Sequence, residues 1–203
     1  QGDLNPTTRI VRNNIALNCF GGGELNPNGE QGMGYYADGK SGRIRFINNT
    51  VSTALLGYFV NGGSYVTVDS CLSFDCSKGY YLIKLELPIT NDSVMNNNFI
   101  TKSTHNGSGT GQYSAYFEPG AGIMPTTFYA TNNCYGSPIN QTDGWIWIDS
   151  LGNNRYKTLS QLKATAFWRG QDANSVHSLK SVSDVIEFRF IYNSLAGSAT
   201  TNL

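Results

Sequence analysis

The chain has 203 residues, 14 basic and 14 acidic side chains, and no net charge. A protein that binds nucleic acid needs a basic surface to displace the counterions of the phosphates, so this balance argues against a nucleic-acid partner. No apolar run approaches the ~20 residues that span a bilayer, so the chain is not expected to cross a membrane. The length suits one domain, or one repetitive domain with a terminal cap.

The composition points to an all-β protein with many turns. Glycine (23 residues) and asparagine are frequent, and both favour turns over helices. Tyrosine (12) and phenylalanine (10) favour strands. The four cysteines lack the spacing of a zinc site, which leaves free buried thiols or disulfides as the alternatives. They are Cys19, Cys71, Cys76 and Cys134.

In chain order, a first repeated pattern consists of a short β-prone run followed by a polar, mostly Asn-rich bend. The five segments are Arg12–Ala16, Ile47–Val51, Val68–Leu72, Asn96–Ile100 and Thr131–Tyr135. Their anchor positions lie 21 to 35 residues apart and are Asn14, Asn49, Ser70, Asn98 and Asn133. Asparagine tolerates the left-handed conformation of a sharp bend, and its amide can bond to an equivalent Asn in the next coil. We therefore expect a solenoid with an asparagine ladder at one corner.

A second pattern alternates with the first and is rich in aromatic residues. Its members are Gly34–Asp38, Gly57–Asn61, Gly79–Ile83, Ser114–Glu118 and Gly144–Asp149. Each turn of the solenoid thus has at least two strands. The sequence predicts a right-handed, single-stranded parallel β-helix over residues 1–150.

Residues 151–203 differ from the repeats and are expected to form a C-terminal cap. The segment Tyr156–Ala164 predicts a short amphipathic helix with apolar positions at Leu159, Leu162 and Ala166, and a final strand is expected near 184–190. Solenoids need such ends because an open coil exposes its core and unpaired strand groups. No comparable cap precedes Arg9, so we expect preceding coils of a longer chain, or a partner chain in a homo-oligomer, to cover that end.

The chain resembles the C-terminal half of pectate-lyase-like parallel β-helix proteins. The resemblance spans most of the chain, and the segments that carry it are Gly34–Gly39, Asn48–Val51, Leu159–Leu162, Gly170–Val176 and Asn193–Ser198. It implies an extracellular, cell-surface or virion location and a polysaccharide partner. Its members include polysaccharide lyases, glycoside hydrolases, epimerases, phage tailspikes and inactive surface proteins, so it leaves enzymatic activity open. The chain has no Gly-His-Gly, no Asp-Asp pair and no acidic cluster at calcium-ligand spacing. We expect no cofactor, with calcium as the only one the resemblance would suggest.

Candidate catalytic residues lie where the aromatic strands end. Aligning these strands by their first residue places one column of polar ends together: Asp38, Asn61, Lys84 or Ile83, Glu118 and Asp149. Adjacent coils lie ~4.8 Å apart, so Glu118 and Asp149 would approach the ~5–5.5 Å spacing of a retaining glycosidase pair. Lys84 beside Glu118 would suit lyase chemistry, with a base removing a proton and a cation steadying the enolate. The alternative is a set of solvated strand ends with a weak surface ion pair.

Candidate substrate-binding residues follow from the same alternation. If the polar ends point outward, so do Tyr36, Phe59, Tyr116, Trp145 and Trp147. Exposed aromatic rings suit stacking against sugars, so these five and Asn61 predict a carbohydrate-binding face. The alternatives are that loops cover the rings, or that the parity is reversed and they fill the core. The leading hypothesis is a carbohydrate-binding or carbohydrate-active β-helix; the others are a structural rod of a tailspike or fibre, and an adhesin that binds proteins through its sheet edge.

Overall fold

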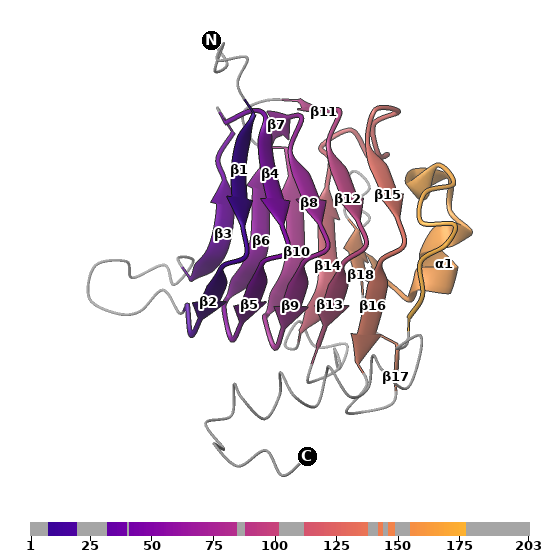
Figure 1. Ribbon diagram of the computed structural model, residues 1–203. Coiled ribbons are helices and arrows are strands. Elements are labelled where there is room, and N and C mark those ends of the chain that lie inside the picture. The colour runs from indigo at the N-terminus through magenta and orange to yellow at the C-terminus, as the bar shows by residue number, and fades with distance from the viewer. Residues whose placement is uncertain are drawn as a thin grey trace, which may run out of the picture.

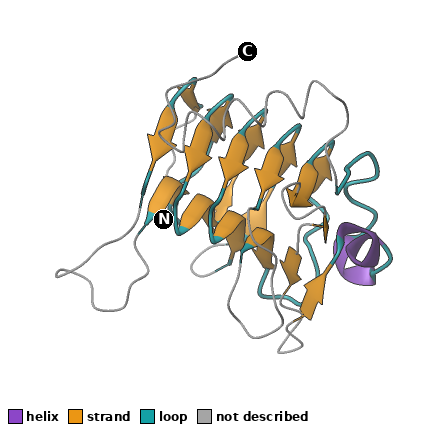
Figure 2. Ribbon diagram, turned by 90° about the horizontal axis from the view of Figure 1, so that it is seen from below, coloured by secondary structure: helices purple, strands orange, loops and turns teal. Residues whose placement is uncertain are grey.

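Short strands wind around a common axis in this computed structural model and stack into three parallel sheets (Figures 1 and 2). The structure describes residues 8–19, 32–39, 41–84, 88–101, 112–137, 142–143, 146–148 and 155–177. Apart from two antiparallel strands at the C-terminal end, neighbours within each sheet come from successive coils rather than from hairpins, and they run parallel in register. The predicted all-β parallel β-helix is confirmed.

Each coil contributes one strand to each of three sheets. The first sheet contains β1 (Arg9–Arg12), β4 (Ile44–Ile47), β8 (Thr67–Asp69), β12 (Ser93–Met95) and β15 (Tyr129–Thr131). The second contains β2 (Ile15–Leu17), β5 (Thr50–Ser52), β9 (Leu72–Phe74), β13 (Asn98–Ile100) and β16 (Cys134–Ser137). The third contains β3 (Met33–Ala37), β6 (Leu56–Asn61), β10 (Lys78–Ile83), β14 (Tyr113–Glu118) and β18 (Ile146–Ile148). A small extra ladder pairs β7 (Gly63–Ser64) with β11 (Ile89–Thr90).

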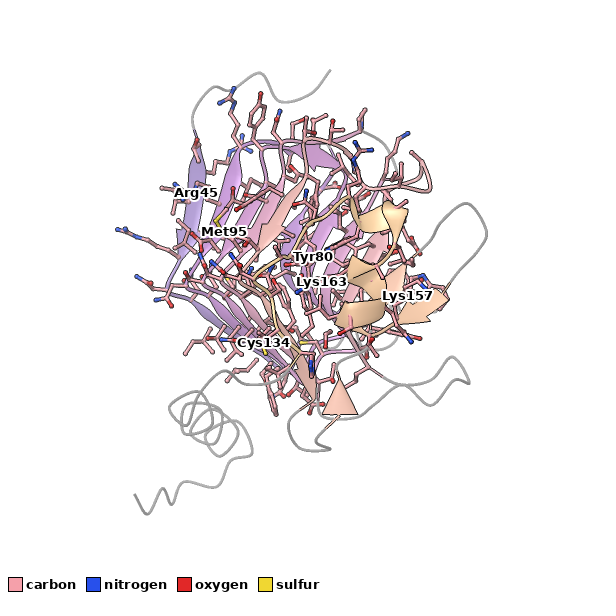
Figure 3. The ribbon with its side chains drawn as sticks, turned by 90° about the vertical axis from the view of Figure 1, so that its right-hand side faces the viewer. Arg45, Tyr80, Met95, Cys134, Lys157 and Lys163 are labelled. Atoms are coloured by element: carbon pink, nitrogen blue, oxygen red, sulfur yellow. The ribbon has the colours of Figure 1, made fainter. Side chains whose placement is uncertain are left out.

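The core lies inside the coil, where alternate residues of each strand meet their equivalents from the next coil. The first sheet contributes one inward row and the third sheet two, because its strands are longer. These rows are Phe46, Val68, Val94 and Ala130; Tyr35, Tyr58, Tyr80, Ala115 and Ile146; and Ala37, Val60, Leu82, Phe117 and Ile148. Figure 3 views the coil along its axis, with Tyr80 inside and Arg45 on the outer surface.

Glycine is the second residue of β3, β6 and β10 because the next coil and the second sheet leave no room for a side chain there. A Cβ atom added to Gly57 would lie 2.3 Å from the Gly79 carbonyl oxygen and 2.9 Å from the Ser73 hydroxyl. One added to Gly34 would lie 2.2 Å from a methyl group of Val51. The repeated Gly-aromatic pattern therefore reflects a steric requirement of the corner, and the aromatic residues follow it at a fixed distance.

The predicted asparagine ladder runs through the corner between the first and second sheets. Its members are Asn14, Asn49, Cys71, Asn97 and Asn133. The Oδ1 of each later asparagine accepts the backbone N–H of the preceding member, as in Asn14 N to Asn49 Oδ1 at 3.0 Å. The left-handed residue is the one before each member, with φ between 51° and 58°: Asn13, Asn48, Ser70, Asn96 and Asn132.

Two of the predicted anchors, Ser70 and Asn98, are wrong by one residue. The register pairs Leu72 with Asn98, which makes Asn98 an exposed strand residue and puts Asn97 in the ladder. Since successive residues of a strand face opposite sides, a slip of one position exchanges a buried amide for an exposed one.

Cys71 occupies the single rung of this ladder that lacks an amide or hydroxyl acceptor. Its Sγ accepts the Asn49 N–H at 3.5 Å and lies 3.5 Å from the Phe46 carbonyl oxygen. Asn97, the next member of the ladder, makes the same contact with its side-chain amide, which donates to the Val68 carbonyl at 3.0 Å. The thiol therefore occupies an asparagine site with weaker hydrogen bonds.

Replacing Cys71 with asparagine is expected to raise the free energy of unfolding by about 1 kcal/mol, because neutral amide bonds would replace the weak thiol contacts. Chemical denaturation followed by circular dichroism would measure it. Cys71→Ala is the matched control and should destabilise the protein. Equal destabilisation by both variants would contradict an amide-shaped site.

The C-terminal end of the coil is closed by elements that do not continue the repeat. β17 (Thr142–Asp143) and β19 (Arg155–Lys157) pair antiparallel with β16 and β18. α1 (Leu159–Lys163) begins with a capping box formed by Thr158 and Gln161. The 3₁₀ turn η1 (Ala166–Trp168) places the centroid of the Trp168 ring 4.6 Å from that of Phe117 in the fourth coil.

The predicted short helix is therefore confirmed, although it is only five residues long. Leu159 and Leu162 are buried as expected, whereas Ala166 is exposed at the start of η1. The domain boundary at residue 150 stays a prediction, and the expected strand at 184–190 lies outside the described residues. All four cysteines are free thiols. No described helix has the length and apolar character needed to cross a membrane.

Candidate functional site

Five aromatic side chains form a row on the outer face of the third sheet, one from each coil. We call this the aromatic row; its members are Tyr36, Phe59, Tyr81, Tyr116 and Trp147. They occupy register-equivalent positions, one residue after the inward row that contains Tyr35, Tyr58 and Tyr80. Neighbouring ring centroids lie 4.8 to 5.2 Å apart, so the row follows the coil axis. The outward parity predicted for Tyr36, Phe59, Tyr116 and Trp147 agrees with this placement.

The rings form two parallel stacks that meet at an angle. Tyr36 and Phe59 differ by 5° in ring plane, and Phe59 and Tyr81 by 16°. Tyr116 and Trp147 form the second stack, with planes 11° apart. The planes of Tyr81 and Tyr116 differ by 75°, so the row turns between the third and fourth coils.

Lys78 lies at this turn in the row. Its Nζ is 4.2 Å from the ring centroids of both Tyr81 and Tyr116, which is cation–π distance for both. Tyr113 packs edge-on against Tyr116 and Trp147 with centroids 5.8 and 5.9 Å away. Both Lys78 and Tyr113 come from the strand position just before the glycine or serine of the pattern, and the register pairs them directly. The second half of the row is thus a cluster of rings around one ammonium group.

The rings of the row cover one another to different degrees. Phe59 is only 7% exposed because Tyr36 and Tyr81 stack on its two faces, whereas Tyr36 is 41% exposed. Tyr81, Tyr116 and Trp147 are half-buried. The most accessible aromatic surface of the row therefore lies at Tyr36.

Polar groups border the row where the strands end. The Asp38 carboxylate accepts hydrogen bonds from the Tyr36 hydroxyl (2.7 Å), the Gly39 N–H (2.8 Å) and the Asn61 amide (3.2 Å). The buried Asn61 Oδ1 has no hydrogen-bond partner. Three coils beyond Asp38, Glu118 accepts a 3.0 Å hydrogen bond from the Tyr81 hydroxyl. Each carboxylate is thus fixed by a hydroxyl of the row itself.

The structure brings together only part of the predicted catalytic column. Register pairs Asn61 with Ile83 and Ile83 with Glu118, so Ile83 rather than Lys84 stands in the column. Lys84 follows one residue later; its backbone N–H donates to the Glu118 carbonyl, and its aliphatic chain lies against Gly120. Asp149 and Trp145 lie outside the described residues. The catalytic role of Glu118, Asp149 and Lys84 stays a prediction.

The two carboxylates described in this column are too far apart to act as a glycosidase pair. Asp38 and Glu118 are three coils apart, which at ~4.8 Å per coil separates their strands by ~14 Å. Retaining enzymes need ~5–5.5 Å and inverting enzymes ~6.5–9.5 Å. Asp38 and Glu118 therefore do not form a glycosidase pair with each other.

Sequence reasoning missed three side chains of this face: Tyr81, Lys78 and Tyr113. Tyr81 could have been found, because Gly79-Tyr80-Tyr81 aligns directly with Gly57-Tyr58-Phe59. Lys78 and Tyr113 precede the aligned glycine or serine, and only their contacts with the rings of the row show that they belong to this face.

Two buried carboxyl groups lie away from the aromatic row. Asp172 ends the asparagine ladder, accepting bonds from Asn133, Ser175 and Tyr135; burial raises its pKa, and these bonds offset part of the effect. Burial raises the pKa of Asp92 to about 7, partly offset by the amides of Val66 and Tyr65. No cluster of three or more His, Cys, Asp or Glu side chains suited to a metal ion occurs among the described residues.

Comparison of the chain with protein-family models, with curated proteins and with solved structures found no match. The protein is a parallel β-helix with an aromatic outer face and a capped C-terminal end.

Proposed function

We propose that the outer face of the third sheet binds a carbohydrate chain running along the coil axis. The observation that carries this proposal is the aromatic row, whose five rings lie 4.8 to 5.2 Å apart along the coil axis and are most exposed at Tyr36. A polysaccharide is a linear repeating polymer, and a linear array of similar groups can contact its successive units. Sugar C–H faces pack against aromatic carbon, which offsets the cost of leaving such rings on a surface.

The polar border supplies the hydrogen bonds that such a ligand needs. Asp38 and Glu118 accept hydrogen bonds, and the tyrosine hydroxyls can both donate and accept. Because these groups already bond to one another, they are held in place before a ligand arrives. A preorganised set of polar groups beside aromatic surface is typical of sites that recognise polyhydroxylated ligands.

We assign binding rather than cleavage to the described part of this face, because Asp38 and Glu118 are too far apart to act together. The resemblance to pectate-lyase-like proteins supports a polysaccharide as the ligand class and an extracellular, cell-surface or virion location. A lyase or hydrolase activity that includes Asp149 or Trp145 would extend the same proposal.

Replacing Tyr36 with alanine is expected to weaken glycan binding by about ten-fold, because it removes the most accessible ring and releases Asp38. A glycan array would identify ligands, and titration calorimetry would give the dissociation constants. Tyr129→Ala is the matched control, since Tyr129 is 52% exposed but lies on the first sheet. Equal losses in both variants would place binding elsewhere.

A depolymerisation assay separates binding from cleavage. Release of reducing or unsaturated ends by the chain, lost in Glu118→Gln, would establish an enzyme with Glu118 at its site. Binding without release of products is the outcome that the described geometry favours. Failure to bind any glycan would reject the proposal.

A structural rod is the second candidate function, favoured by the stacking of the described coils in parallel register along one axis. A rod requires stacking in larger assemblies, so a stable trimer or polymer in sedimentation analysis would support it. A monomer that binds glycans would favour the first proposal.

A further inference from the structure

The outer face of the first sheet carries arginine and isoleucine in alternating positions. The outward side chains are Ile10 and Arg12 on β1, and Arg45 and Ile47 on β4. The register pairs Ile10 with Arg45 and Arg12 with Ile47, so each arginine has an isoleucine beside it on the next strand. Figure 3 shows Arg45 on the outer surface of the coil. Because these side chains point away from the coil axis, a neighbouring coil would lie beside them and would not cover them.

A third arginine, Arg43, stands at the corner just before β4. Its guanidinium lies over the ring of Tyr65, 4.8 Å from the centroid, which is cation–π distance. Arg43 and Tyr65 have φ values of 56° and 63°, and Asn91 has 56° at the same corner one coil further along. This left-handed conformation suits asparagine and is costly for larger side chains. The protein therefore places an exposed arginine and an exposed tyrosine where asparagine would be less strained.

Within the described residues, the arginines of this face have no carboxylate partner. None of Arg12, Arg43 and Arg45 forms an ion pair there. Asp69 lies on the same face, but its Oδ1 accepts a 2.9 Å hydrogen bond from the Asn96 amide of the next coil, on the side away from the arginines. Since the chain as a whole has no net charge, this face is a local concentration of positive charge and matches an anionic partner.

We infer that this face docks on an anionic lipid surface. We call it the checkerboard face; its members are Ile10, Arg12, Arg43, Arg45, Ile47 and Tyr65. Guanidinium groups form paired, charge-assisted hydrogen bonds with headgroup phosphates, and clusters of basic side chains bind anionic leaflets. The isoleucines between them can enter the boundary between headgroups and acyl chains, where tyrosine rings are also favoured. A soluble acidic polymer would satisfy the arginines but would gain nothing from the isoleucines, so a lipid surface fits the alternation better.

Co-sedimentation of the full chain with lipid vesicles tests the inference. Vesicles of phosphatidylcholine alone are compared with vesicles of phosphatidylcholine mixed with phosphatidylglycerol. The protein is expected to bind only the anionic vesicles, and less strongly as salt is added, because salt screens exposed charges.

A double variant, Arg43→Asn with Arg45→Thr, removes two charges from the checkerboard face. Both new residues occur at the same positions of later coils, as Asn91 and Thr67, so the fold should be retained. The variant is expected to weaken binding to the anionic vesicles by about 30-fold. The matched control, Lys157→Thr with Arg169→Asn, removes two charges from the cap and should leave binding nearly unchanged. Equal weakening by both double variants would overturn the inference, because binding would then follow charge alone.

Ile10→Ser separates a lipid surface from a soluble polyanion. Ile10 is 54% exposed, so its replacement leaves the core intact. The variant is expected to weaken vesicle binding several-fold and to leave binding to dextran sulfate unchanged. Binding to dextran sulfate without binding to anionic vesicles would assign the face to an acidic polymer and overturn the inference, as would binding to neither. Tyr36→Ala should bind vesicles like the wild type, because the aromatic row lies on another sheet, so this test is independent of glycan binding.

Discussion

Asn97→Ala is expected to lower the free energy of unfolding by about 3 kcal/mol, whereas Asn98→Ala should change it by no more than about 0.5 kcal/mol. Asn97 is 1% exposed, and its Oδ1 accepts the Cys71 N–H at 2.8 Å. Its amide donates to the Val68 carbonyl and to Asn133 Oδ1, both at 3.0 Å. Asn98 is exposed on β13.

The large effect comes from the groups that the variant leaves behind. Alanine at 97 leaves the Cys71 N–H buried without an acceptor and removes a donor from Asn133, and each unsatisfied buried group costs about 1–3 kcal/mol. For a chain of this length, 3 kcal/mol corresponds to a fall of about 6–12 °C in melting temperature. Urea denaturation of both variants and the wild type would measure the difference. Equal effects at 97 and 98 would show that the ladder register is not the one described.

Asn97 and Asn98 also show how much of the ladder could be predicted from the sequence. Three consecutive asparagines, 96 to 98, mark a corner clearly, and the expectation of a corner was correct. The choice among them depends on which residue faces inward, and that is decided by contacts with Cys71 and Asn133, 26 and 36 residues away. Long insertions between coils remove the fixed interval that would otherwise set the register.

The outward position of the aromatic row was easier to predict than the arrangement of its rings and of the polar groups beside them. Period-two alternation after an aligned glycine was sufficient to place Tyr36, Phe59 and Tyr116 on the outer face. The 75° turn between Tyr81 and Tyr116, and the position of Lys78 within it, depend on side-chain packing that no spacing rule describes. The sequence left Lys84 and Ile83 as alternatives in the column of polar ends, and the register selects Ile83 because β10 ends there.

Nothing in the sequence indicated that the Asp92 side chain would be buried. Asn91-Asp92-Ser93 has the composition of an exposed turn, and Asn91 is indeed exposed with a φ of 56°. The next side chain nevertheless turns inward and is 1% exposed. The side chain turns inward because its Oδ1 accepts a hydrogen bond from the Val66 N–H of the previous coil at 2.8 Å. A carboxyl group thereby takes a buried corner position.

Asp92→Asn is expected to stabilise the protein at pH 8 and to have little effect near pH 4. Burial raises the pKa of Asp92 to about 7, and its Oδ2 has no hydrogen-bond partner. Between the unfolded pKa and 7, the folded state therefore binds more protons than the unfolded state. Stability falls as pH rises through this window and is constant above it for this group.

The size of the effect follows from the same shift. A rise from 3.8 to about 7 corresponds to roughly 4 kcal/mol between pH 4 and pH 8, as an upper bound for one carboxyl group. Asparagine cannot ionise and keeps an oxygen for the Val66 N–H, so the variant should retain the stability of the protonated form. Asp172 also has a raised pKa, so the wild-type curve contains more than one contribution. Only the difference between wild type and variant isolates Asp92.

The measurement is the free energy of unfolding of both proteins in urea at several pH values from 4 to 8.5. The difference should be small at pH 4, grow through neutrality and level off above pH 7. Asn91→Ala is the matched control, since it alters the same corner without an ionisable group and should give a loss that does not vary with pH. A constant difference for Asp92→Asn would show that the carboxyl group is ionised in the folded protein throughout this range. It would then require a compensating positive group or solvent beside Oδ2.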